Sequence, residues 1–226
     1  MGCSSLTSIK IPDSVTTIGE GAFYDTPLFE LKKKENPLVI INGILIDGED
    51  CSGDVIIPDG VKIIGNDAFL GCIGLTSVTI PDSVISIGAG AFSDCVDLIS
   101  VDIPNSVTSI GDGAFRACEN LIFIKIPNSV ISIGDEVFAG CEKLPTTEIP
   151  DSVTSIGKFI FSGVGDLEEI KILNPECILP EFIINVEEGE GMIFDITIYG
   201  YDNSTAQTYA KKYGYKFKSL GESPIK

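Results

Sequence analysis

The stretch that decides the fold reads Leu75-Thr76-Ser77-Val78-Thr79-Ile80-Pro81-Asp82-Ser83-Val84-Ile85-Ser86-Ile87-Gly88, followed by Ala91-Phe92 and Cys95. Leu75, Val78 and Ile80 give the apolar set of a short strand, with alternation over its last residues. Pro81 cannot donate to a strand ladder and therefore ends the strand. Asp82-Ser83 is typical of a turn. The stretch thus predicts one strand with a buried side and a sharp bend after it.

The rest of the stretch predicts further sides of a coil. We expect Val84 and Ile87 to point inward again, Gly88 to permit a change of direction, and Ala91-Phe92 to lie in a short helical or 3₁₀ turn. The same columns recur every 23 residues along the chain. The proline column comprises Pro12, Pro58, Pro81, Pro104, Pro127 and Pro150, and the phenylalanine column comprises Phe23, Phe69, Phe92, Phe115, Phe138 and Phe161.

A unit of this length cannot bury both of its flanks, so neighbouring units must stack on one another. The sequence therefore predicts an α/β solenoid, a right-handed coil of 23-residue units with short strands and short helical or 3₁₀ turns. The pattern Leu-x-x-Val-x-Ile-Pro-x-x-Val-x-x-Ile-Gly-x-x-Ala-Phe-x-x-Cys resembles the Treponema-type leucine-rich repeat of BspA-like proteins and covers nearly the whole chain. The resemblance implies a secreted or cell-surface protein, because several relatives act in adhesion to host proteins or other cells.

We divide the chain into leucine-rich repeats over residues 1–191 and a C-terminal capping unit with a tail over residues 192–226. One repeat is degenerate, with Leu38 and Ile41 at its Val and Ile columns. Asn42-Gly43 between two apolar runs predicts a β-hairpin near 37–47. We interpret Lys32-Lys33-Lys34-Glu35 before it as a solvated loop.

The C-terminal unit carries its own signals. Ser204 suits the N-cap of a helix from Thr205 to Lys212, and Gly214 lies just beyond it. Residues 215–217 are expected to form a last strand over the open end of the solenoid. We expect residues 186–191 to form an acidic surface loop. Gly2-Cys3 lies in phase with Gly71-Cys72, so we interpret the chain as a segment of a longer protein, and the segment shows no signal-peptide pattern.

Composition excludes several classes of function. The net charge of −18 repels nucleic acid and anionic membrane surfaces. The chain has no histidine, so it has no His-based triad, His-dependent metal site or imidazole acid–base chemistry. No apolar run reaches the roughly 18 residues that a membrane span needs. We expect no enzyme, no cofactor, no membrane insertion and a monomeric chain.

Two side-chain columns invite a metal or redox interpretation. In-phase Cys3, Cys72, Cys95, Cys118 and Cys141 predict a column of buried free thiols, with disulfides between coils or zinc as weaker alternatives. Cys51 and Cys177 lie off this column. A second column predicts turn-capping side chains, with a calcium ladder as the alternative; it comprises Asp13, Asp59, Asp82, Asn105, Asn128 and Asp151. Asp112 and Asp135, after the glycine column, are predicted helix caps.

The outward positions of the strands hold the candidate binding site. Most are small and polar, but Ile99, Ile122 and Phe123 are expected to form an exposed apolar cluster, with Asp102, Lys125 and Glu148 as a charged rim. An apolar centre with a charged rim is typical of a protein-binding surface, although the cluster could be incidental drift within a repeat. The leading hypothesis is a module that binds an extracellular protein or cell-surface component. A structural spacer and a glycan-binding module are the alternatives.

Overall fold

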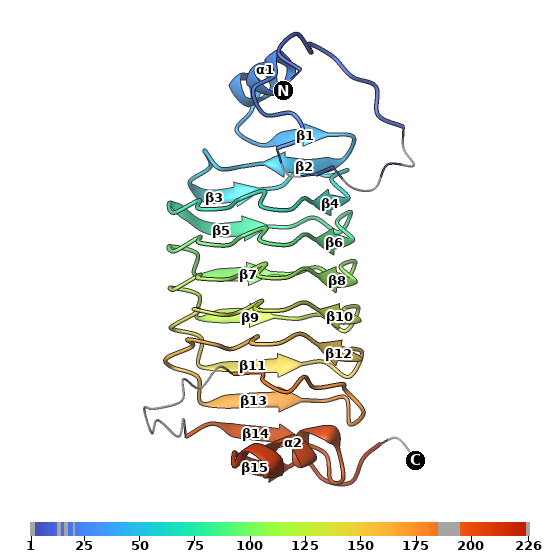
Figure 1. The fold of residues 1–226 in the computed structure, drawn as a ribbon, viewed down its shortest axis with the longest axis vertical. Helices are drawn as coiled ribbons and strands as arrows, with labels where there is room; N and C mark the ends of the chain where they lie inside the picture. The colour runs from blue at the N-terminus through green and yellow to red at the C-terminus, as the bar shows by residue number, and fades with distance from the viewer. Residues whose placement is uncertain (1–2, 13–14, 16–17, 20, 185–194, 225–226) are drawn as a thin grey trace.

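The chain folds into a stack of short coils (Figure 1). The computed structural model describes residues 3–12, 15, 18–19, 21–184 and 195–224. Two four-stranded sheets form one long side of the stack, here called the strand face. The first contains β3 (Gly53–Ile56), β5 (Leu75–Thr79), β7 (Ser100–Asp102) and β9 (Phe123–Lys125), and the second contains β11 (Thr146–Ile149), β13 (Glu169–Ile172), β14 (Thr197–Gly200) and β15 (Lys216–Ser219).

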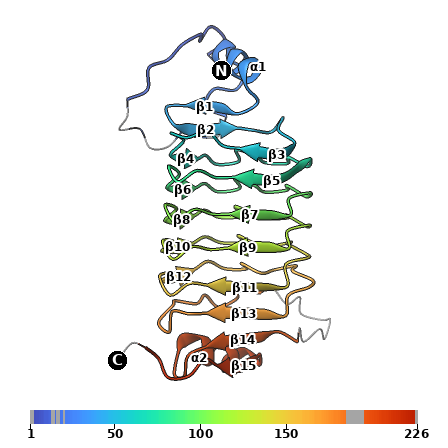
Figure 2. The ribbon, with the colours of Figure 1, turned by 180° about the vertical axis from the view of Figure 1, so that it is seen from behind.

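A second side carries a seven-stranded sheet, seen from behind in Figure 2. Its strands are β1 (Val39–Ile41), β2 (Ile44–Asp47), β4 (Ile63–Ile64), β6 (Ser86–Ile87), β8 (Ser109–Ile110), β10 (Ser132–Ile133) and β12 (Ser155–Ile156). Ser86 pairs with Ser109, and Ile87 pairs with Ile110, so the register advances by one repeat per strand. The solenoid that the repeat predicts is therefore confirmed.

The core is a continuous column of apolar side chains. Phe69, Phe92, Phe115, Phe138 and Phe161 are at most 1% exposed, and their rings stack with centroids 5.0 to 6.0 Å apart. Leu75, Val78, Ile80, Val84 and Ile87 are also buried, as predicted. Each large apolar side chain contributes about 1.5–3 kcal/mol, so packing between coils dominates the stability.

The back of each unit is a chain of turns, where the sequence predicts a short helical or 3₁₀ turn. The N–H of Ser93 donates to Gly90 within the unit (2.8 Å), whereas the N–H of Phe92 donates to Ala114 of the next unit (2.8 Å). Gly90 and Asp94 adopt the left-handed region, with φ of 61° and 59°. Every second N–H group thus donates to the neighbouring coil, so the consecutive hydrogen bonds within one segment that define a helix cannot form.

Two expected capping roles are wrong. For Asp59, Asp82, Asn105, Asn128 and Asp151, the described part of the chain shows no side-chain hydrogen bond; Asp13 lies outside the described residues. The serine after this column bonds the previous coil at three positions, as in Ser83 Oγ donating to the Val61 carbonyl (2.8 Å), whereas Ser106 Oγ has no partner in the described residues. Asp112 accepts from the N–H of Asp135 (2.9 Å), and Asp135 accepts from that of Lys158 (2.8 Å). These two carboxylates therefore join coils and cap no helix.

The degenerate repeat contains the hairpin that Asn42-Gly43 predicts. β1 pairs antiparallel with β2, and both turn residues have positive φ, at 53° and 71°. The hairpin shifts the chain by four residues, so Leu45 pairs with Ile64 at the Ile column, where Ile41 was expected. Ile41 packs instead in a small second core. The back of this unit is correspondingly shorter.

Gly48 closes the phenylalanine stack on this shortened back. A Cβ here would lie 2.7 Å from Cδ1 of Phe69, so only glycine lets the backbone pass over the ring. Residues 32–35, expected as a solvated loop, belong to helix α1 (Pro27–Glu35). Thr26 caps this helix by accepting from the N–H of Phe29 (3.2 Å), and Pro27 occupies its first turn.

The two ends of the stack differ. No described residue between 3 and 24 lies in a strand, although Leu6, Pro12 and Phe23 keep the repeat phase. Phe23 packs with Leu28, Phe29 and β1 in the small second core. The C-terminal unit follows its prediction: Ser204 caps α2 (Thr205–Tyr213), Gly214 follows in the left-handed region, and β15 pairs with β14. The expected acidic loop 186–191 and the boundary at 191/192 lie outside the described residues.

Candidate functional site

The strand face brings the predicted site residues together. Ile99, Ile122 and Phe123 are 46%, 52% and 60% exposed, so none of them folds down into the core. The N–H of Ile122 donates to Ile99 (3.0 Å), which fixes these two residues side by side. Asp102 pairs with Lys125 in the ladder between β7 and β9, and both side chains are exposed, as is Glu148 on β11. We call these six residues the strand-face patch.

The patch lies where the strand ladder is interrupted. β9 pairs with β7 and β11 pairs with β13, but the described strands form no ladder between β9 and β11. Just before β7 and β9, the N–H of Ile99 donates to Thr76 and the N–H of Ile122 donates to Ile99, one bond per coil. The next residue in this column is Pro145, which has no N–H and interrupts the series. On β11, Thr147 replaces the usual Val, and its buried Oγ1 has no partner in the described residues. The backbone hydrogen bonding of the strand face is thus interrupted between β9 and β11.

Two other groups on the same face, the exposed Ile56 and the partly exposed Tyr199, were not identified from the sequence. Ile56 on β3 is 73% exposed, so the patch is not the sole apolar feature of the face. Tyr199 on β14 donates its hydroxyl to Glu169 (2.7 Å), and the ammonium groups of Lys171 and Lys218 lie 5.9 and 5.1 Å from its ring centre. Extending strand alternation to β3 and to the irregular C-terminal units would have identified Ile56 and Tyr199.

The cysteines form a buried column, with one exception. Cys72, Cys95, Cys118 and Cys141 are free and at most 1% exposed, whereas Cys3 is exposed, so its predicted burial is wrong. Each buried thiol donates to a carbonyl of the previous coil, as in Cys95 to Phe69 (3.1 Å) and Cys118 to Phe92 (3.1 Å). Off the column, Cys51 and Cys177 are also free and buried.

Burial raises the pKa of these thiols. The pKa of Cys72 and Cys177 rises from 9.0 to about 11, and that of Cys95 and Cys141 to about 12. The pKa of Cys118 is also raised, because burial penalises the thiolate. At neutral pH the thiols are protonated, which makes them poor nucleophiles and poor metal ligands.

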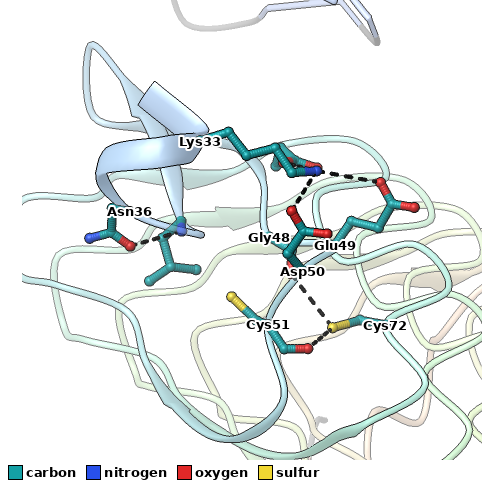
Figure 3. Close-up of polar contacts among 9 residues, drawn as sticks. Lys33, Asn36, Gly48, Glu49, Asp50, Cys51 and Cys72 are labelled. Atoms are coloured by element: carbon teal, nitrogen blue, oxygen red, sulfur yellow. Dashed lines mark hydrogen bonds and ion pairs between the residues drawn. The ribbon is translucent and has the colours of Figure 1, made fainter. Parts of the chain in front are cut away.

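A charged cluster anchors α1 to the hairpin unit (Figure 3). Lys33 Nζ lies 3.2 Å from Asp47, 3.0 Å from Asp50 and 3.8 Å from Glu49. Burial lowers the pKa of Lys33, but hydrogen bonds and charges from Asp50 and Asp47 outweigh this effect and raise it from 10.5 to about 12. Asp47 is 3% exposed. The lysine therefore neutralises a buried carboxylate, and the arrangement is a structural clamp.

A groove of about 830 Å³ lies between the connection at residues 175–181 and α2. Its lining includes Ile178, Thr208, Lys212 and Tyr213. Ile178 is 68% exposed and Thr208 is also exposed, so the groove is open to solvent. Sequence patterns gave no signal for it, because the groove joins an irregular connection to the capping helix.

The described residues show neither a metal site nor a membrane-spanning helix. They contain no group of three or more Cys, Asp or Glu side chains that could hold a metal ion. Within those residues, no helix is long and apolar enough to cross a bilayer.

The parallel coils, the phenylalanine stack and the exposed strand face define a leucine-rich-repeat solenoid. The family model described as the BspA type leucine rich repeat region matches residues 1–44 and 49–168, in six copies. The chain therefore belongs to the BspA-type leucine-rich-repeat family. Repeats of this family are typically non-catalytic. No curated protein matches the chain.

Two of the similar solved structures share the fold, those of the T. pallidum protein and PcpA. The leucine-rich-repeat protein of T. pallidum is 25% identical with a TM-score of 0.54, covering 74% of this chain and 86% of its own. The pneumococcal vaccine antigen PcpA is 19% identical with a TM-score of 0.58. That match covers 94% of this chain but 54% of PcpA, so the chain spans about half of its length. A leucine-rich cell surface protein from Faecalibacterium prausnitzii is 22% identical with a TM-score of 0.35, covering 69% and 61%.

Proposed function

We propose that this chain is a non-catalytic binding module of a secreted or cell-surface protein, and that its strand-face patch binds an extracellular protein. One observation carries the proposal: Ile99, Ile122 and Phe123 are all about half exposed and adjacent on one face. Exposed aromatic and aliphatic side chains inside a charged rim have the composition of a binding hot spot. Extracellular adhesion by BspA-like proteins supports the location and the class of partner.

The test is a single substitution measured in two ways. Phe123→Ser removes an exposed ring, so the melting temperature should stay within a few degrees of the wild type. Binding to an immobilised panel of extracellular matrix and cell-surface proteins should weaken at least tenfold, because the ring is the aromatic anchor of the patch. Ile56→Ser, which removes an exposed apolar side chain on the same face two strands away from Asp102, is the matched control. Unchanged binding by Phe123→Ser would remove the patch from the function.

The groove beside α2 supports a second candidate, a glycan-binding module. Tyr209 and Tyr213 line the groove, and Thr208 and Lys212 offer polar groups at its rim. A mixed aromatic and polar lining suits small ligands. Thr208→Arg would fill the groove without touching the core, so it should abolish binding on a glycan array. Glycan binding that survives Thr208→Arg would exclude the groove.

A further inference from the structure

The outward side chains of the strand face form two straight columns, one residue per strand. The first column runs Asp54, Ser77, Ser100, Phe123, Thr146, Glu169, Thr197 and Lys216. The second runs Ile56, Thr79, Asp102, Lys125, Glu148, Lys171, Tyr199 and Lys218. The repeat period continues both columns across the gap between β9 and β11. Every side chain in them is exposed or partly exposed.

The charges of these columns are self-complementary. Along the second column, Asp102, Lys125, Glu148 and Lys171 alternate in sign, so reversing their order exchanges the charge at every position. The first column has Asp54 on its first strand and Lys216 on its last. The face has eight strands, and its midpoint falls between β9 and β11. A surface whose inverted copy carries the opposite charges can bind itself about a two-fold axis.

We propose that the strand face binds a second copy of this chain, face to face, about a two-fold axis that runs along the strands between β9 and β11. This inference rests on the proposed function, because it names the partner of the strand-face patch. The axis sets Lys125 opposite Glu148 of the second copy, Asp102 opposite its Lys171, and Asp54 opposite its Lys216. Each pair occurs twice, and no like charges meet within the two columns. The inference replaces the monomer expected from the sequence.

The same axis places Ile122 and Phe123 at the centre of the interface, whereas Ile99, one strand further out, faces Glu168 of the second copy. Phe123 lies on β9, directly beside the axis, so the rings of the two copies lie about one strand spacing apart, roughly 4.8 Å. Ile122 faces Pro145 of the second copy, which adds apolar surface. The resulting order is an apolar centre with charge pairs on both sides, which is the usual anatomy of a specific interface.

Electrostatics also favours this position of the two-fold axis over a position one half strand spacing away. An axis through β9 would set Lys125 opposite its own copy and Asp102 opposite Glu148, so like charges would meet at three positions. The two columns are narrow, so we expect a contact area smaller than the roughly 800 Å² per partner of a stable interface. Each copy also carries a net charge of −18. We therefore expect a weak dimer that forms only at high protein concentration, as suits contacts between neighbouring molecules on a surface.

A charge exchange tests the geometry. Lys125→Glu and Glu148→Lys should each stay monomeric in sedimentation equilibrium, because each variant sets like charges opposite each other. An equimolar mixture of the two variants should associate, because the carboxylate introduced at position 125 of one variant then faces the ammonium group introduced at position 148 of the other. The wild type should rise from 24.0 kDa toward twice that mass across a hundredfold concentration range. Lys158→Glu, the same charge change at an exposed position off the strand face, should associate like the wild type.

Each result has one interpretation, once circular dichroism shows that every variant is folded. A wild type that stays at 24.0 kDa, or a mixture that fails to associate while the wild type does, overturns the dimer. A monomeric wild type that binds a different extracellular protein, and loses it with Phe123→Ser, refutes the dimer and retains the proposed function. A wild type that neither self-associates nor binds any protein of the panel refutes both.

Discussion

At the scale of single residues, the cysteine column combines two roles, core packing and hydrogen bonding between coils. A cysteine is small enough for the interior of a coil, and its S–H still has a proton for a carbonyl of the previous coil, as in Cys118 to Phe92. The adjacent phenylalanine fills the volume and stacks on its neighbours. Serine at the proline turn does the same for another carbonyl, through Ser83 and Val61. The column thiols and the hydroxyls of Ser83, Ser129 and Ser152 thereby have hydrogen-bond partners, whereas Ser106 Oγ has none in the described residues.

Removal of one ring from the middle of the stack should be costly. Phe115 is fully buried between Phe92 and Phe138, so Phe115→Ala should lower the free energy of unfolding by about 3–5 kcal/mol through the cavity it leaves. Phe123→Ala makes the same chemical change at a position that is 60% exposed and should cost less than about 1 kcal/mol. Denaturant titration measures both, and equal losses would contradict the inward and outward assignment.

Thiol chemistry should distinguish Cys3 from the other six cysteines. Cys3 is exposed, whereas the remaining thiols are buried and their raised pKa keeps them protonated. We expect one thiol to react rapidly with an aromatic disulfide reagent in the folded state, and the other six to react only after denaturant is added. Cys3→Ser should abolish the rapid phase. Rapid reaction of several thiols in that variant would contradict the buried column.

At the scale of elements, the repeat pattern predicts the strands of the strand face in the regular units, and the local cap signals predict the whole capping unit. The pattern predicts inward-pointing residues on the second side but not the short strands found there, such as β6. It fails at residues 3–24, where Leu6, Pro12 and Phe23 keep the repeat phase but no described residue forms a strand. It also fails at residues 26–45. Thr26-Pro27 is a helix start signal, but the three lysines that follow suggested a solvated loop. The hairpin was predicted, yet periodicity could not show that it displaces Leu45 into the Ile column. The exposure of Ile99, Ile122 and Phe123 is as predicted. The charge pattern of the two columns could not be predicted, because it depends on the pairing of β13, β14 and β15, where the repeat spacing of the sequence is irregular.

The clamp between α1 and the hairpin unit gives a test at this scale. Lys33→Met leaves the buried Asp47 carboxylate without its cation, so we expect a loss of roughly 3 kcal/mol of stability. Lys32→Met is the control: among the described residues Lys32 pairs with the exposed Glu35 alone, so this variant should change stability by less than about 0.5 kcal/mol. Adding Asp47→Asn to Lys33→Met should restore part of the loss. Equal stabilities of the two lysine variants in urea titrations would show that the clamp contributes nothing.

At the scale of the whole molecule, the thiol column couples stability to alkaline pH. The ordinary pKa of 9.0 applies to the unfolded chain, whereas Cys72 and Cys177 titrate near 11 and Cys95 and Cys141 near 12 when folded. The folded state then holds protons that the unfolded state releases. The stability that these groups contribute is fully present below pH 9 and is lost as the pH rises through 11 to 12. Lys33 and Tyr209, whose pKa values are both raised to about 12, act in the same direction.

When the pH rises from 8 to 10, each such thiol should therefore lower the free energy of unfolding by about 1 kcal/mol. Urea titrations at the two pH values, with reductant present, measure the total loss. Cys95→Ala lowers stability at both pH values but should make the loss between them smaller by about 1 kcal/mol, because one shifted group is gone. Cys3→Ser should leave the loss unchanged, since Cys3 is exposed. If Cys95→Ala kept the full wild-type loss, the alkaline sensitivity would come from groups outside the column.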